Sequence, residues 1–286
     1  METGSIGCAV HEAAKAGVEG KVVAVFERSV HLGSVDMVIT LGGFDLPAHP
    51  FTIRCSNPPR GLRLGQEFRL GEGTLSIPGS CALEILDYEV FSPAMMVETM
   101  ASTREMILAL QAARIVVATT SFKDGFHSFV MGGPMHGVIT QAVLPLIQRM
   151  GDALSDRDWD GVVSVGVDLA GVGEGLTPSG DDFLVGLMAA LHFHRASGGV
   201  GPDTHYLETL AEKAAERTSP LSGQNIKAAA EGWVADVVAQ WLTSLHLGDS
   251  EDVRVATHTL LSFGHSSGVD TFAGMVNGLS SLLEER

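Results

Sequence analysis

The chain is short of cysteine, of basic residues and of aromatic side chains. Cys8, Cys55 and Cys81 lie far apart and form no C-x-x-C pair, which excludes a disulfide framework or a structural zinc site and fits a reducing compartment. Only 18 Lys and Arg residues stand against 34 Asp and Glu, so the formal net charge is −16. This balance excludes non-specific binding to nucleic acid or to anionic membranes, because both need a positive surface. Any bound phosphate must therefore be held by backbone N–H groups, a metal ion or selected arginines.

Long hydrophobic runs are also missing. Residues 1–20 contain no apolar core of a secretory signal, and no later uncharged stretch reaches the ~18 residues of a membrane span. The sequence therefore predicts a soluble, cytoplasmic protein that binds neither nucleic acid nor membranes.

Residues 21–93 have the composition of short strands separated by Gly and Pro turns. We expect residues 1–93 to form a β-rich N-terminal domain, a small antiparallel sheet or barrel. The expected strands are residues 22–26, 37–41, 51–55, 67–70, 74–77 and 82–86.

The character of the chain changes after Pro93, where apolar residues recur at three- and four-residue steps. Residues 94–286 are predicted to form a larger, mainly α-helical domain, which makes the whole an α+β protein. Residues 161–168 have strand composition in a helical neighbourhood and stay unassigned. The expected helices are residues 95–118, 138–154, 184–195, 206–217, 226–245, 253–263 and 272–285.

Residues 171–183 carry the densest chemistry in the chain, with alternating glycines that run into Thr-Pro-Ser-Gly-Asp-Asp and then a helix. Alternating glycines let backbone N–H groups turn toward an anion at the helix start, and adjacent carboxylates are ligands of the kind that hold Mg²⁺. We predict ligand-binding roles for Gly171, Gly173, Gly175, Thr177, Ser179 and Gly180, and catalytic or magnesium-binding roles for Asp181 and Asp182.

A second motif at residues 264–274 repeats the pattern Ser-Gly-x-Asp-x-x-x-Gly of residues 179–186. In each copy the aspartate and the last glycine are four residues apart and share a helix face, so another backbone can approach there. We interpret the motifs as a degenerate internal repeat whose two helix starts form one polar pocket. The second motif adds His265 and Asp270 as catalytic candidates and Ser266, Ser267 and Gly268 as ligand-binding candidates.

Other interpretations stay open for these residues. Ser, Thr and Asp at a helix start are also ordinary caps, although a cap needs one acceptor and the first motif supplies several. Arg217 is a candidate for binding phosphate or carboxylate, with a solvated helix-end arginine as the alternative. The motif lacks the Gly-Lys-Ser/Thr ending of a P-loop and the third glycine of a Rossmann fingerprint, and the chain has no flavin, NAD or haem signature.

The motifs Gly-Leu-Thr-Pro-Ser-Gly-Asp-Asp at 175–182 and Gly-His-Ser-Ser-Gly-x-Asp at 264–270 resemble those of the AllH family, a bacterial domain long without an assigned function. Members of that family are associated with anaerobic allantoin and purine degradation and with oxamate carbamoyltransferase, which interconverts oxalurate plus phosphate with oxamate plus carbamoyl phosphate. The resemblance implies a carbamoyltransferase subunit with further subunits as partners.

Three functional hypotheses follow. The first is an enzyme subunit that binds carbamoyl phosphate or another phosphorylated ligand, with Mg²⁺ on Asp181 or Asp182, a proton moved by His265 and a carboxylate oriented by Arg217. The second is phosphotransfer from Mg-ATP, and the third is a non-catalytic regulatory or structural subunit. The sequence leaves a homo-oligomer open.

Overall fold

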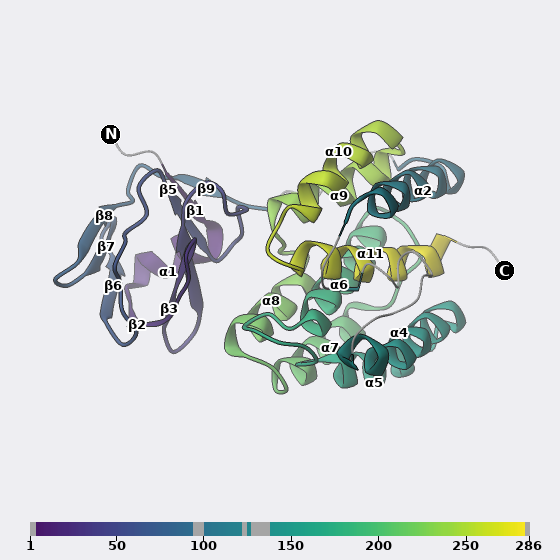
Figure 1. Cartoon of the computed structure of the whole chain (residues 1–286), viewed down its shortest axis with the longest axis horizontal. Coiled ribbons are helices and arrows are strands. Elements are labelled where there is room, and N and C mark those ends of the chain that lie inside the picture. The colour runs from purple at the N-terminus through teal and green to yellow at the C-terminus, as the bar shows by residue number, and fades with distance from the viewer. Residues whose placement is uncertain (1–3, 94–99, 122–124, 127–137, 284–286) are drawn as a thin grey trace. The chain divides into compact units, whose positions relative to one another are not determined.

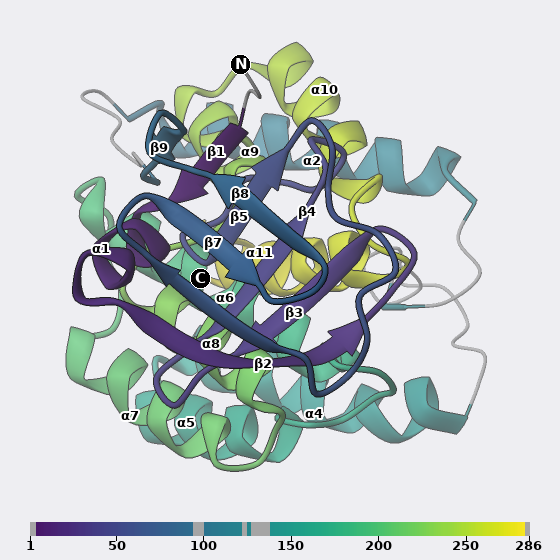
Figure 2. The ribbon, with the colours of Figure 1, turned by 90° about the vertical axis from the view of Figure 1, so that its left-hand side faces the viewer.

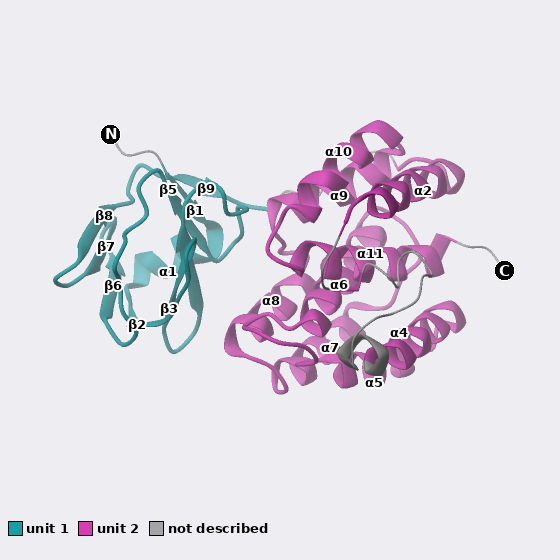
Figure 3. Ribbon diagram, in the orientation of Figure 1, with its two compact units in different colours: residues 1–93 teal, residues 94–286 magenta. Residues whose placement is uncertain are grey.

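The computed structural model of the chain describes residues 4–93, 100–121, 125–126 and 138–283. It divides the chain into two compact units, residues 1–93 and residues 94–286 (Figure 3). The first unit is a curled sheet and the second is helical, which confirms the predicted α+β fold class.

The first unit is built on one nine-stranded sheet with the order β8-β7-β6-β2-β3-β4-β5-β1-β9 (Figure 2). Neighbouring strands are antiparallel except for the pairs β4–β5 and β1–β9, which are parallel. Its core includes Leu32, Ile39, Ile53 and Leu75, all fully buried. The described strands are β1 Gly4–Gly7, β2 Val18–Val25, β3 Ser29–Gly33, β4 Val38–Gly42, β5 Thr52–Cys55, β6 Glu67–Gly71, β7 Thr74–Ile77, β8 Cys81–Glu84 and β9 Glu89–Phe91, and helix α1 spans Cys8–Ala16.

The second unit packs its helices around α6 and α11, which lie side by side at its centre (Figure 1). Phe183 of α6 and Phe272 of α11 are fully buried in one core together with Trp241. The described helices of this unit are α2 Thr103–Thr119, α4 Val138–Asp156, α5 Trp159–Leu169, α6 Ser179–Ala196, α7 Thr204–Ala215, α8 Pro220–Ala230, α9 Asp236–Leu247, α10 Ser250–Leu261 and α11 Ser267–Leu283.

Two glycines set how closely α6 and α11 approach. A Cβ atom at Gly186 would clash with the carbonyl oxygen of Thr271, and one at Gly274 would clash with that of Phe183. Each glycine therefore lies against the backbone of the other helix, where a side chain would not fit. The repeated sequence pattern predicted this close approach. The helix starts carry the two motifs to one end of this pair.

The helices expected over residues 226–245 and 95–118 differ in the structure, and α6 and α11 begin earlier than expected. The single helix expected over residues 226–245 is wrong, because α8 ends at Ala230 and Gly232, with φ of 82°, turns the chain before α9. Residues 100–102 are not helical, because Ser102 and Glu105 form a capping box that starts α2 at Thr103, while residues 95–99 of that prediction lie outside the described residues. The unassigned residues 161–168 belong to helix α5.

No helix in the described part of the chain combines the length and the apolar character that a membrane span requires.

Candidate functional site

The two motifs fold in the same way at the starts of α6 and α11. The N–H of Gly180 donates to the carbonyl of Val172 at 2.8 Å, and the N–H of Gly268 donates to the carbonyl of Phe263 at 3.1 Å. A side chain on either glycine would clash with backbone carbonyls of the preceding segment. The internal repeat is therefore a repeat of backbone geometry, with each loop folded tightly onto the first turn of its helix.

A pair of buried carboxyl groups lies between these helix starts. Asp182 is 8% exposed and Asp270 is fully buried. Each accepts a hydrogen bond from the serine that opens the other helix, so that Ser267 is bonded to Asp182 and Ser179 to Asp270. This exchange joins the two motifs into one site, which we call the carboxyl pair, Asp182 and Asp270.

Further donors surround the carboxyl pair. Thr177 is hydrogen-bonded to Asp182 and Ser266 to Asp270, and the backbone N–H of Phe126 donates to Oδ1 of Asp270 at 2.7 Å. Oδ2 of Asp182 and Oδ2 of Asp270 are buried and have no hydrogen-bond partner in the described structure. Each carboxyl group is thus anchored through one oxygen and offers the other.

Burial makes both groups hold protons more tightly. The pKa of Asp182 is raised well above its usual value, first by burial and then by the charges of Asp270 and Asp181, while the hydroxyls of Ser267 and Thr177 oppose the shift. Burial likewise raises the pKa of Asp270 to about 6, against the lowering effect of the Phe126 N–H. Asp270 therefore exchanges its proton near pH 6, as acid–base catalysis or a protonation-dependent site requires.

Asp181 has a different environment from its neighbour. Its Oδ1 accepts the N–H of Gly171 at 2.7 Å, and its Oδ2 accepts the hydroxyl of Thr218. Both oxygens are therefore used to tie the glycine-rich loop to the turn before α8. Consecutive helical residues point in different directions, so Asp181 does not share a ligand position with Asp182.

The described structure does not contain a preformed cage for the Mg²⁺ predicted on Asp181 and Asp182. No group of three His, Cys, Asp or Glu side chains in the described ranges is placed to hold a metal ion. Asp181 has no oxygen left over, and Asp182 and Asp270 each offer a single one. The residues present do not fit the predicted Mg²⁺ on the Asp181–Asp182 pair.

The glycine-rich loop, residues 171–178, adopts the backbone conformation for which its glycines are suited. Gly171, Gly173 and Gly175 have φ of 76°, 128° and 89°. The backbone N–H groups of residues 173–177 donate to no acceptor in the described structure, and residues 174–176 are exposed. On its other side the loop is anchored at the carbonyl of Leu176, which accepts the hydroxyls of Ser219 at 2.7 Å and Ser222 at 3.1 Å.

His265 and Arg217 lie at the margins of this arrangement. Both side chains are exposed. The carbonyl of Arg217 packs against Gly171, which places the end of α7 beside the loop, but no interaction given by the structure joins its guanidinium to the carboxyl pair. The structure thus brings together the two motifs around Asp182 and Asp270, with Asp181 turned toward the loop.

Phe126 is a site residue that sequence reasoning missed. It is 1% exposed, packs edge-on against Phe183 with ring centroids 6.2 Å apart, and donates its N–H to Asp270. No local pattern could have found it, because 144 residues separate it from Asp270.

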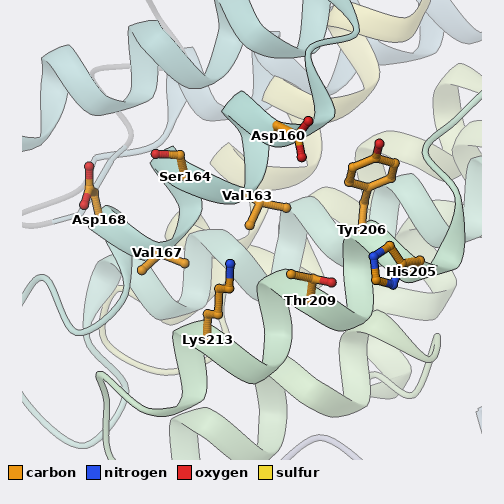
Figure 4. Close-up of a pocket in the computed structure, with 9 residues that line it drawn as sticks. All are labelled: Asp160, Val163, Ser164, Val167, Asp168, His205, Tyr206, Thr209 and Lys213. Carbon is orange, nitrogen blue, oxygen red and sulfur yellow. The ribbon is translucent and has the colours of Figure 1, made fainter.

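A pocket of about 360 Å³ between α5 and α7 was also missed (Figure 4). The sequence signal for this pocket was a set of polar residues spaced four apart on each of the two helices. This spacing places one row of polar side chains on α5 and another on α7. Figure 4 shows Lys213 from one wall and Asp160 and Asp168 from the other, so the pocket combines both charge signs. It is lined by Asp160, Val163, Ser164, Val167, Asp168, His205, Tyr206, Thr209 and Lys213.

The fold and site thus define an α+β protein whose helical unit pairs two Ser-Gly-x-Asp helix starts around buried carboxyl groups. Residues 169–279 match the family model described as oxamate carbamoyltransferase subunit AllH. The matched segment runs from the end of α5 into α11 and includes both motifs, which confirms the resemblance expected from them and associates the chain with a carbamoyltransferase subunit. No curated protein and no solved structure matches the chain.

Proposed function

We propose that the chain is a subunit of a carbamoyltransferase similar to oxamate carbamoyltransferase, acting in purine or allantoin degradation. Its site for carbamoyl phosphate or another phosphorylated ligand lies where α6 and α11 begin. The family match over residues 169–279 supports the reaction class. The observation that carries the location is the exposed loop with unused N–H groups beside the buried carboxyl pair.

Backbone N–H groups are the means by which this chain can hold phosphate. The N–H groups of residues 173–177 have no acceptor in the described structure and lie immediately before the N-terminus of α6, where the helix dipole also favours an anion. Such a site needs no basic cluster, which suits a chain of net charge −16.

The carboxyl pair supplies the acid–base group of the proposed site. The raised pKa values keep a proton on the pair near pH 6, so a bound anion does not face two negative charges. That proton can be given to, or taken from, a ligand atom beside either Oδ2. Because both oxygens of Asp181 accept hydrogen bonds from the protein, this scheme routes no step through Mg²⁺ on the Asp181–Asp182 pair.

Ligand binding tests the proposal. The full chain is screened by thermal shift with carbamoyl phosphate, ADP, ATP, oxamate and oxalurate, each with and without Mg²⁺. We expect carbamoyl phosphate to stabilise the chain without Mg²⁺, by about 3 kcal/mol at a hundredfold excess over its dissociation constant. Stabilisation by Mg-ATP alone would instead support phosphotransfer.

Asp182→Asn and Asp168→Asn form a matched pair for this screen. The asparagine that replaces Asp182 resembles the protonated carboxyl group that burial favours, so the fold should survive. Ligand binding should weaken at least tenfold, because the amide cannot exchange a proton with the ligand as the carboxyl group can. Asp168 is exposed on α5 in the other pocket, and its substitution should leave binding unchanged. If Asp168→Asn is the variant that loses the ligand, the proposed site is wrong.

Catalysis is tested separately by release of inorganic phosphate. Turnover that requires co-purified subunits would support a chain that binds ligand but depends on partners, as the description of the matched family as a subunit suggests. Turnover by the chain alone would exclude the non-catalytic alternative.

A further inference from the structure

We propose that the carboxyl pair recognises the –NH₂ group of the ligand, so that the site selects carbamoyl and primary amide compounds over methyl compounds of the same shape. This inference rests on the proposed function and adds to it the residues that distinguish the –NH₂ group of the ligand from a methyl group.

The first ground is a mismatch of hydrogen-bonding groups. Oδ2 of Asp182 and Oδ2 of Asp270 are buried acceptors without a partner in the described structure. Burying such an oxygen without a donor costs free energy, so it is rare in proteins unless a ligand supplies the donor. The unprotonated member of the pair only accepts hydrogen bonds, so a ligand group with N–H donors suits it.

The second ground is the charge around the pair. Asp182 faces Asp181 on its own helix and Asp270 on α11, and both raise its affinity for a proton. In the described ranges no Lys, Arg or His forms an ion pair with either member. Around Asp270 the polar neighbours are Ser179, Ser266 and the Phe126 N–H, each of which already donates. Within the described part of the chain, the two Oδ2 atoms thus have neither a cation nor a donor beside them.

The third ground is symmetry. Asp182 and Asp270 occupy equivalent positions of the internal repeat, each bonded to the serine of the other copy. A primary amide nitrogen carries two hydrogens, so an –NH₂ group can donate to whichever member of the pair is unprotonated. A phosphate offers acceptors in this place and leaves the unprotonated oxygen without a donor.

The glycine-rich loop and the carboxyl pair suit opposite ends of one carbamoyl phosphate molecule. The hydroxyls of Thr177 and Ser267 lie 3.4 Å apart, which joins the end of the glycine-rich loop to the carboxyl pair. The loop N–H groups suit the phosphate end, and the pair suits the –NH₂ end.

Methyl isosteres test the inference on the full chain. Acetyl phosphate replaces the –NH₂ of carbamoyl phosphate by –CH₃, and pyruvate does the same for oxamate. Titration calorimetry should give a dissociation constant at least tenfold lower for each amide than for its methyl partner, because the methyl compound leaves the carboxyl oxygens without donors. This comparison requires no variant.

Asp270→Asn provides the variant arm, with Asp168→Asn as its control. The asparagine that replaces Asp270 can still accept the Phe126 N–H, but its amide group opposes a ligand –NH₂. The preference for carbamoyl over acetyl phosphate should fall toward one while acetyl phosphate binds as before, and the control should keep the preference. Asp182→Asn serves the same purpose if Asp270→Asn does not fold.

The outcomes separate this inference from the proposed function. Equal binding of carbamoyl and acetyl phosphate would overturn the inference and leave a phosphate site in place. Failure of both phosphates to bind would overturn the proposed function and this inference with it. A preference that appears only when Mg²⁺ is added would also overturn the inference, because a metal ion would then satisfy the carboxyl oxygens.

Discussion

The three aspartates at the starts of α6 and α11 have different roles because their carboxyl groups have different hydrogen-bond partners. Asp181 is buried and gives both oxygens to the protein, to the Gly171 N–H and the Thr218 hydroxyl. Asp182 and Asp270 are also buried, but each keeps one oxygen free. Asp181 is thus suited to holding the loop, and the other two are suited to contacting a ligand.

The residue-scale prediction concerns stability against pH. The pKa of Asp270 rises from 3.8 to about 6 on folding because the group is buried. The folded state therefore holds a proton that the unfolded state has released, so this contribution to stability is complete below about pH 4 and is lost as pH rises through about 6. The total loss is about 3 kcal/mol, and the raised pKa of Asp182 acts in the same direction.

Urea unfolding of the chain and of Asp270→Asn between about pH 4 and pH 7 measures this contribution. The variant should show a shallower fall in the free energy of unfolding across that range, whereas Asp168→Asn should follow the parent chain. Parallel curves for the parent and Asp270→Asn would contradict the assignment of a buried, proton-holding Asp270.

At the scale of elements, α6 and α11 show what the sequence could predict and what it could not. The repeated Ser-Gly-x-Asp-x-x-x-Gly pattern predicted a close approach, and Gly186 and Gly274 provide it. Both helices begin earlier than their apolar patterns suggested, because the motif residues themselves form the first turns. Helix propensity alone did not separate α8 from α9, since the break depends on the turn at Gly232.

The short elements of the first unit were harder to predict. Strands β1 and β9 and helix α1 were missed, and so was β3, whose sequence Ser-Val-His-Leu-Gly offers no run of apolar residues. Strand β1 is held by pairing with β5 and β9, which are distant in the sequence. Such pairing depends on tertiary contacts that no local window contains.

The element-scale prediction is that Gly186→Ala separates α6 from α11. The new methyl group would meet the Thr271 carbonyl, which belongs to the backbone and cannot turn aside, so we expect a loss of about 2 kcal/mol or more. Tryptophan fluorescence during urea unfolding reports it, because Trp159, Trp233 and Trp241 all lie in the helical unit.

Gly151→Ala on α4 is the matched control. A Cβ atom there has its nearest neighbour at 3.5 Å, an ordinary contact, so alanine should stabilise the helix by up to about 1 kcal/mol. If both variants unfold at the same urea concentration as the parent chain, the close approach of α6 and α11 is not what the glycines provide.

At the scale of the whole molecule, the predicted chemistry is confined to one unit. Every predicted site residue lies in residues 94–286, and the family match falls inside the same unit. The sheet of residues 1–93 has a core of its own and none of these residues. The net charge of −16 leaves backbone groups, rather than a basic surface, as the proposed means of binding an anion.

The central claim is that two motifs, far apart in the sequence, form one site. A crystal structure of the full chain with carbamoyl phosphate tests it most directly. We expect the phosphate on the N–H groups of residues 173–177 and the ligand nitrogen between Asp182 and Asp270. A ligand that contacts only one motif, or that lies in the pocket between α5 and α7, would contradict it.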